Sequence, residues 1–287
     1  MCDDDIHPGL VVDPTVSRRA FGLMAAAATG VAGAARAATP VVEKDVEIKT
    51  PDGVADAALY YPEGKGSWPA VLIWPDVMSL RPAFREMGRR LAASGYVVLV
   101  PNLYYRVKRA PVIDGAFSFA NPEDRAKITP LRATVTPDGT ARDAVAYLAF
   151  LDAQPQTNKK KKAGVQGYCM GGPLSVQTAA AAPDRIAAVA SFHGGGLFTD
   201  QPSSPHLLLP KTKAEYLILV AENDDKQDPT SREKFKAALD AAKRPSKVEV
   251  YAGAAHGWTV KGSQVYNEPA AEKAWAELLD LYKRNLG

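Results

Sequence analysis

Cys169 is the residue whose surroundings most clearly suggest chemistry. It lies at the centre of GYCMG (residues 167–171), which has the spacing of the nucleophile elbow G-x-S-x-G with cysteine in place of serine. An apolar strand precedes it and a helix follows at once, as an elbow requires. The start of that helix favours a thiolate, and the backbone N–H of Met170 would face a developing oxyanion. The alternative is a buried cysteine that acts as a small hydrophobic residue.

His256 is the candidate general base for this nucleophile. It lies in YAGAAHGW (residues 251–258), in a small-residue loop between a strand and the last helix. A second stretch, LVAENDDKQDP (219–229), places acids after a buried strand, so the chain order is nucleophile, acid, base. Asp224 is the first choice for the acid that orients the imidazole, and Asp225 is the near rival. Asp228 is expected to cap the helix that follows it.

The three other histidines are weaker candidates for chemistry. His7 lies near the N-terminus, and His206 lies in a proline- and serine-rich loop that we expect at the surface. His193 follows a buried strand and is either a structural residue or part of the rim of the active site. A metal site formed by His193, His256 and acids is disfavoured, because no spacing such as H-x-x-x-H occurs. We therefore expect no metal and no cofactor.

The elements that must position these residues alternate between strand and helix. This alternation predicts parallel β-α-β units and an α/β fold, with a mostly parallel central sheet flanked by helices in a single domain over residues 38–287. Residues 106–138 are rich in charge and proline, and we expect a cap there with one short helix near 123–132. The expected strands cover 46–48, 57–61, 70–74, 96–100, 164–167, 186–192, 216–221 and 248–251, and the other expected helices cover 82–93, 140–153, 171–182, 229–243 and 268–285.

Charge and length exclude some classes of partner. The chain has 287 residues, with 35 basic and 32 acidic side chains, and a formal net charge of +3. This excess is too small to indicate binding to nucleic acid or to anionic lipid. The one basic block, Lys159–Lys162, is expected to be a solvated turn before the next strand.

Residues 1–37 have the features of an export signal. The pair Arg18-Arg19 precedes an apolar, alanine-rich run at 22–35, and Ala35-Arg36-Ala37 fits cleavage between small residues. The pattern resembles a twin-arginine signal, which predicts recognition by the twin-arginine export machinery, a periplasmic location and no membrane anchor after cleavage. If the leader is not a working signal, the protein stays in the cytoplasm. Cleavage would leave Cys169 as the only cysteine and therefore as a free thiol.

The motifs together resemble the dienelactone hydrolase family. The family elbow reads G-x-C-x-G-G and is matched by GYCMGG at residues 167–172. The family acid lies in G-x-x-D, which Ala221 to Asp224 matches except that alanine replaces glycine, and the family base lies in G-x-x-H, matched by Gly253 and His256. The downstream Pro229, with Ser231 and Arg232, also favours Asp224. The similarity covers most of residues 45–285.

This resemblance implies an α/β-hydrolase fold, a Cys169–Asp224–His256 triad and no cofactor. It also implies that the Val77 N–H is the second oxyanion donor beside Met170. Two positions depart from the family. Members that open dienelactones have a glutamate that interacts with the cysteine at rest, and the matching position here is Asp76, which is one methylene shorter. Cap-region arginines hold the substrate carboxylate in those enzymes, and Arg125 and Arg132 are the arginines available here.

The residues therefore predict a hydrolase that acts on small-molecule carboxylic esters or lactones through an acyl-enzyme intermediate. One alternative is a general carboxylesterase or thioesterase that uses the same triad. Another is a non-catalytic binding protein with this fold and a redox-sensitive thiol. The intact acid and histidine argue against the binding protein, which has no need of both.

Overall fold

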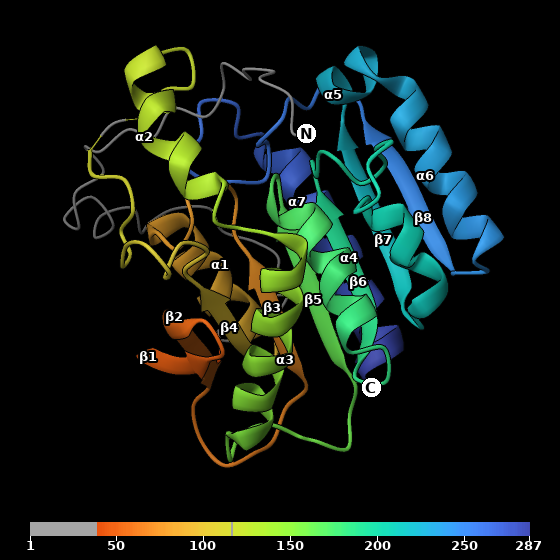
Figure 1. Cartoon of the computed structure of the whole chain (residues 1–287). Helices are drawn as coiled ribbons and strands as arrows, with labels where there is room; N and C mark the ends of the chain where they lie inside the picture. Colours follow the sequence, from red (N-terminus) through yellow and green to blue (C-terminus); the bar gives the residue numbers. More distant parts are fainter. Residues whose placement is uncertain (1–38, 116) are drawn as a thin grey trace, which may run out of the picture.

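The central feature of the computed structural model, which describes residues 39–115 and 117–287, is an eight-stranded sheet. Its strand order is β1-β2-β4-β3-β5-β6-β7-β8 (Figure 1). β1 and β2 form an antiparallel hairpin, β2 is antiparallel to β4, and the remaining neighbours are parallel. The strands are β1 (Val41–Thr50), β2 (Gly53–Pro62), β3 (Ala70–Trp74), β4 (Val97–Pro101), β5 (Ala163–Tyr168), β6 (Ile186–Phe192), β7 (Glu215–Ala221) and β8 (Ser246–Tyr251).

Helices cover both faces of this sheet. α3 and α4 pack on one face, together with α6 beyond them, while α1 and α7 pack on the other (Figure 1). The helices are α1 (Pro82–Ala93), α2 (Pro122–Arg132), α3 (Pro137–Ala153), α4 (Gly171–Ala181), α5 (Glu222–Gln227), α6 (Pro229–Ala241) and α7 (Glu268–Leu286), with a 3-10 helix η1 (Pro205–Lys211). The predicted α/β fold, with a mostly parallel sheet flanked by helices in one domain, is confirmed.

The core follows from strands that are buried on both faces. In β3 all five side chains are buried, and they alternate between the two hydrophobic clusters: Leu72 and Trp74 face α3 and α4, while Val71 and Ile73 face α1 and α7. This arrangement explains why the strand reads as a continuous apolar run rather than as an alternating pattern.

Some elements differ from the predicted ones. The β1–β2 hairpin is longer than the expected strands at 46–48 and 57–61, because its charged outer residues hide the strand pattern. The acids that follow β7 form the short helix α5, which was not predicted from the sequence. The segment around His206, expected to be a loop, contains η1. Asp228 caps α6 by accepting a hydrogen bond from the Ser231 N–H, as predicted.

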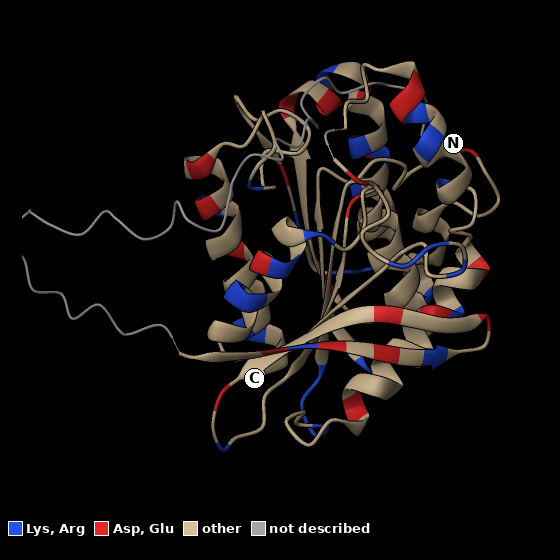
Figure 2. Cartoon of the chain, turned by 90° about the vertical axis from the view of Figure 1, so that its left-hand side faces the viewer, with Lys and Arg blue, Asp and Glu red and all other residues tan. Residues whose placement is uncertain are grey.

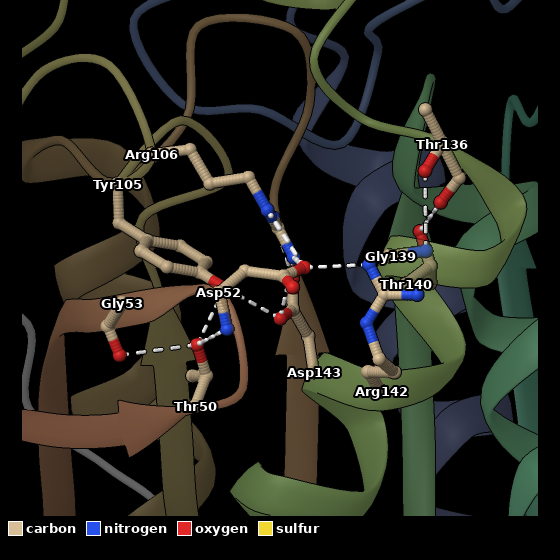
Figure 3. Close-up of polar contacts among 10 residues, drawn as sticks. All are labelled: Thr50, Asp52, Gly53, Tyr105, Arg106, Thr136, Gly139, Thr140, Arg142 and Asp143. Atoms are coloured by element: carbon tan, nitrogen blue, oxygen red, sulfur yellow. Dashed lines mark hydrogen bonds and ion pairs between the residues drawn. The ribbon is translucent and has the colours of Figure 1, made fainter.

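Arg106 and Asp143 lie near the two ends of the segment 106–138. Together with Asp52 they form one ion-pair network, which we call the clamp. Arg106 lies where the segment begins, after β4, and donates to both oxygens of Asp143 on α3, at 2.8 and 2.9 Å. Its guanidinium also donates to Asp52 in the β1–β2 turn, at 2.6 Å (Figure 3). The Tyr105 hydroxyl donates to Asp143 as well, at 2.7 Å. The clamp thus joins both ends of the segment to the edge of the sheet, while α2 lies above the sheet (Figure 1).

Charged residues of both signs are interspersed over the helices and the β1–β2 hairpin (Figure 2). This distribution agrees with the small net charge of the chain. Across residues 39–287, apart from 116, no helix has the length and apolar character needed to cross a membrane. The expected leader, 1–37, lies outside the described residues.

Candidate active site

Cys169 lies at a sharp turn between β5 and α4. Its backbone has a φ of +52°, which side-chain-bearing residues rarely adopt and which marks strain at functional turns. The turn requires glycine on both sides. A Cβ on Gly167 would lie 1.9 Å from the carbonyl oxygen of Gly171, and a Cβ on Gly171 would lie 2.4 Å from that of Trp74. The glycine spacing seen in the sequence therefore reflects a steric requirement, and it holds the cysteine at the start of α4.

His256 lies in the loop after β8 and is held from two sides by consecutive residues of α5. Its ring nitrogen Nδ1 is 2.7 Å from Oδ2 of Asp224. Its backbone N–H donates to Oδ1 of Asn223, at 2.8 Å. The rival acid Asp225 instead forms an ion pair with Arg232. The structure thus places Asp224, rather than Asp225, against the imidazole.

Burial and the neighbouring groups shift the pKa of His256 in opposite directions. Burial disfavours the imidazolium, but the charge of Cys169, hydrogen bonds to Asp224 and Cys169, and the Asp224 charge together raise the pKa of His256 to about 10. The imidazole is therefore hydrogen-bonded to the acid through Nδ1, and the charge of Cys169 acts on the same ring.

His193, which the sequence left open between two roles, is a buried neighbour of this ring. It is 1% exposed, and its ring lies edge-on to that of His256 with centroids 4.8 Å apart. Its Nε2 is 3.0 Å from Oγ1 of Thr259. His193 does not line the site cavity, and its burial among rings supports the structural role.

Cys169 and His256 open onto a cavity of about 610 Å³. Apolar walls come from Phe119 of the segment 106–138 and from the loop after β6, which contributes Leu197 and Phe198. Arg132, the last residue of α2, is one of the charged side chains in the lining. Such a concave site, mostly apolar with a few polar groups, suits a small organic ligand.

Of four other predicted site residues, two line the cavity and two do not. Val77 and Met170, the expected oxyanion residues, both line the cavity. Arg125 does not, because its guanidinium donates to the carbonyl of Phe119 at 2.6 Å. Asp76 is fully buried outside the lining.

Asp76 binds Arg81 through both carboxylate oxygens, at 2.6 and 2.7 Å. This arrangement does not support Asp76 or Arg125 as substrate-binding residues, because the polar groups of both are engaged elsewhere.

Sequence reasoning missed Asn223 and the glycine loop 194–196. Asn223 directly precedes the predicted acid, but nothing in its type shows that it binds the histidine backbone. The three glycines line the cavity next to α4. A Cβ on Gly194 would lie 2.2 Å from the Ser191 hydroxyl oxygen, so close packing against β6 explains the first of them. The run of three glycines was visible in the sequence and was a usable signal for an approach of backbone to the site.

The arrangement provides the parts for nucleophilic acyl transfer. A cysteine is linked to a buried histidine, the histidine is linked to a carboxylate, and two backbone segments that can supply oxyanion donors line the same cavity. Within the described residues, no three His, Cys, Asp or Glu side chains gather in a group that could hold a metal ion.

Comparison with known proteins agrees with this fold and identifies a family. The model of the dienelactone hydrolase family matches residues 55–286. The chain is 26% identical over 273 residues to a Salmonella typhi protein, covering 88% of this chain and 96% of the relative. It is 25% identical over 255 residues to the carboxymethylenebutenolidase of Rhodococcus opacus, covering 86% of this chain and 94% of the relative. The structure of the dienelactone hydrolase-like promiscuous phosphotriesterase P91, from metagenomic libraries, superposes with a TM-score of 0.70 at 21% identity, covering 86% and 99% of the two chains. At this identity, the superposition supports the fold alone.

Proposed function

This chain belongs to the dienelactone hydrolase family, and on that basis we propose that it hydrolyses carboxylic esters or lactones with Cys169 as nucleophile. The observation that supports the proposal best is the buried imidazole of His256, which lies 2.7 Å from Asp224, lines the same cavity as Cys169 and has its pKa raised by the charge of Cys169. A binding protein would not need this chain of groups, since the imidazole of His256 is costly to bury unless it is paired.

The reaction follows from the roles of these groups. The Cys169 thiolate attacks the carbonyl carbon, and the carbonyl electron pair moves to oxygen, where the N–H groups of Met170 and Val77 stabilise it. The C–O bond then breaks, and the imidazolium of His256 protonates the leaving alkoxide. Water, deprotonated by His256, attacks the thioester and releases the acid and the thiolate. Asp224 holds the imidazole tautomer throughout.

A labile ester is the expected substrate class. A thiolate is a good nucleophile and also a good leaving group, so the tetrahedral intermediate partitions forward only when the other leaving group departs easily. Enol esters and lactones meet this condition better than amides do. Arg132 in the cavity lining supports a substrate with a carboxylate beside the ester, because a guanidinium binds carboxylates well.

Hydrolysis of p-nitrophenyl acetate and of a dienelactone by wild type, Cys169→Ala and His256→Ala tests the proposal. We expect turnover by wild type, loss of most activity in both variants, and an acyl adduct on Cys169 detectable by mass spectrometry. A faster rate on the dienelactone identifies a lactonase, whereas a preference for simple esters or thioesters favours the general esterase. Equal activity in all three proteins would remove Cys169 from the mechanism and favour the binding protein.

We also propose that residues 1–37 direct export by the twin-arginine machinery, on the basis of Arg18-Arg19 and the apolar run that follows. Cell fractionation of wild type beside the Arg18→Lys/Arg19→Lys double variant is the test. We expect wild type in the periplasm and the variant in the cytoplasm. The same distribution for both would contradict a twin-arginine signal.

A further inference from the structure

The peptide that joins Val77 to Met78, at the edge of the site cavity, is held on both sides. The carbonyl oxygen of Val77 accepts a hydrogen bond from the Tyr104 hydroxyl, at 2.7 Å. The N–H of Met78 donates to Oδ1 of Asp76, at 2.9 Å. A peptide plane restrained at its oxygen and at its nitrogen has little freedom to rotate, so the carbonyl side of Val77 is fixed relative to the cavity. The Val77 N–H belongs to the preceding peptide, whose carbonyl oxygen, that of Asp76, is also hydrogen-bonded.

Asp76 is itself fixed by a buried ion pair. Arg81, which immediately precedes α1, binds both of its carboxylate oxygens, at 2.6 and 2.7 Å, and the Asp76 carbonyl accepts from the Ser79 N–H at 2.8 Å. The two charged side chains are 0% and 9% exposed. Arg81 also lies over the ring of Phe84, 4.9 Å from its centroid. A bidentate pair of this kind holds its carboxylate in one orientation.

Tyr104 connects both predicted oxyanion residues. It is fully buried, and its hydroxyl oxygen, besides donating to Val77, lies 3.9 Å from Sδ of Met170. Burial, with the charges of Asp76 and Cys169, raises the pKa of Tyr104 well above its usual value, so the hydroxyl stays protonated and remains a donor. Its backbone N–H donates to Oδ1 of Asn102, at 3.0 Å.

We propose that Tyr104 and the Asp76–Arg81 pair are positioning residues for the oxyanion hole, acting through Val77 and, by way of Tyr104, through Met170. This inference rests on the proposed function. It gives Asp76 a role different from that of the glutamate expected at this position by resemblance. The carboxylate is occupied by Arg81 and Met78, and among the described residues no hydrogen bond joins it to Cys169.

The proposal predicts that loss of a positioning residue slows ester hydrolysis but does not change the rate at which Cys169 is alkylated. Hydrolysis of an ester passes through an oxyanion, whereas alkylation of Cys169 by iodoacetamide displaces iodide at a saturated carbon and develops no oxyanion. We expect Tyr104→Phe to lower the Tm by only a few degrees, because the buried Val77 carbonyl loses its donor. It should also lower kcat for p-nitrophenyl acetate about tenfold, with KM unchanged. This is less than the 10²–10³-fold loss from removing an oxyanion donor outright, because the donor is misplaced and not deleted. The alkylation rate of Cys169 should stay at the wild-type value.

Arg81→Lys, which keeps the charge but not the two-oxygen contact, should give the same separation of the two rates. Tyr105→Phe is the matched control. It also removes a hydrogen-bonded tyrosine hydroxyl, but one in contact with Asp143 and Thr50, and it should leave both rates unchanged. The tryptic peptide that carries Cys169 is followed by mass spectrometry, which distinguishes this thiol from Cys2.

Two results would overturn the inference while the proposed function stands: equal ester turnover by Tyr104→Phe, Arg81→Lys and wild type, or a parallel fall of turnover and alkylation. A wild-type enzyme that reacts with iodoacetamide but hydrolyses no ester would overturn both proposals.

Discussion

Two clusters in this molecule join a carboxylate to a cationic or titratable side chain from a distant segment, and they differ in where they end. In the clamp, both oxygens of Asp143 accept from Arg106, whose guanidinium also donates to Asp52 (Figure 3). In the predicted triad, Asp224 binds one side of His256, and the chain of contacts continues to Cys169 at the cavity.

The difference teaches which charged clusters to consider for chemistry. The contacts of the clamp are all with groups of the protein, and none of its three residues lines the site cavity, so its contribution is to hold the ends of the segment 106–138. The predicted triad also joins a carboxylate to a side chain that can carry a positive charge. Its third residue, Cys169, lines the cavity, where a substrate fits. Both clusters contain groups whose pKa values are shifted, so a shifted pKa alone does not distinguish them. Proximity to a cavity does.

The largest effect expected from this contrast is that of Asp224→Asn. We predict a fall in kcat of about 10³–10⁴-fold with little change in Tm, because the amide can neither stabilise the imidazolium nor hold the imidazole tautomer that deprotonates water. Steady-state kinetics with p-nitrophenyl acetate gives the result. Asp225→Asn is the matched control, since Asp225 pairs with Arg232 instead, and its loss should stay below tenfold. The reverse order would make Asp225 the acid.

The pKa of His256 also distinguishes the predicted triad, because it is shifted in the opposite direction from the pKa of His206. Contacts with Cys169 and Asp224 overcome burial and raise the pKa of His256 to about 10, whereas burial lowers the pKa of His206 despite the nearby Asp200. Between about pH 7 and pH 9, His256 should therefore be charged and His206 neutral. Because its folded pKa is raised, the stabilisation from charged His256 is complete below the unfolded value of about 6.5 and is lost as pH rises toward 10.

NMR titration of ¹³Cε1-labelled histidines, assigned with His206→Gln, measures both midpoints. Cys169→Ser should lower the His256 midpoint, because it removes the largest of the contributions that raise it, and should leave that of His206 in place. A wild-type His256 that titrates near or below 6.5 would show that Cys169 and His256 do not form a charged pair.

The clamp should respond in stability and not in catalysis. Arg106→Met leaves Asp143, which is 6% exposed, without its main partner. Breaking a buried pair costs about 3–5 kcal/mol, and partial exposure of Arg106 reduces this to about 2 kcal/mol in free energy of unfolding. Urea denaturation measures it. Arg109→Met, which removes the exposed pair with Glu47, should have no measurable effect. A large fall in kcat for Arg106→Met, with unchanged stability, would place Arg106 in the chemistry.

How much the sequence could predict depends on whether a signal is local. The elbow was predictable because its glycines meet a steric requirement within five residues, and the parallel strands were predictable from continuous apolar runs. The clamp was not, because its contacts join residues 37 and 54 positions apart whose types are ordinary for a surface. The choice between Asp224 and Asp225 had the same difficulty, since the turn of α5 decides which side chain faces the loop of His256.

Asp76 shows a subtler limit. The sequence located it correctly beside the predicted oxyanion residue, but its partner Arg81 five positions later determines what it does. A sequence pattern does not show whether the carboxylate of Asp76 binds Arg81 and Met78 in its own loop or contacts Cys169. Only the geometry separates these two readings.

The smallest predicted effect concerns the two arginines of α2, which the sequence could not rank. Arg132 lines the cavity, whereas Arg125 donates to the Phe119 carbonyl. Arg132→Met should raise KM about tenfold for a dienelactone that carries a carboxylate, which corresponds to about 1.4 kcal/mol of binding, and should leave KM for p-nitrophenyl acetate unchanged. Arg125→Met is the matched control from the same helix and should change neither value more than twofold. Equal losses on both substrates would mean that Arg132 supports the wall of the cavity, as the clamp supports the ends of the segment, and does not recognise the charge of the substrate.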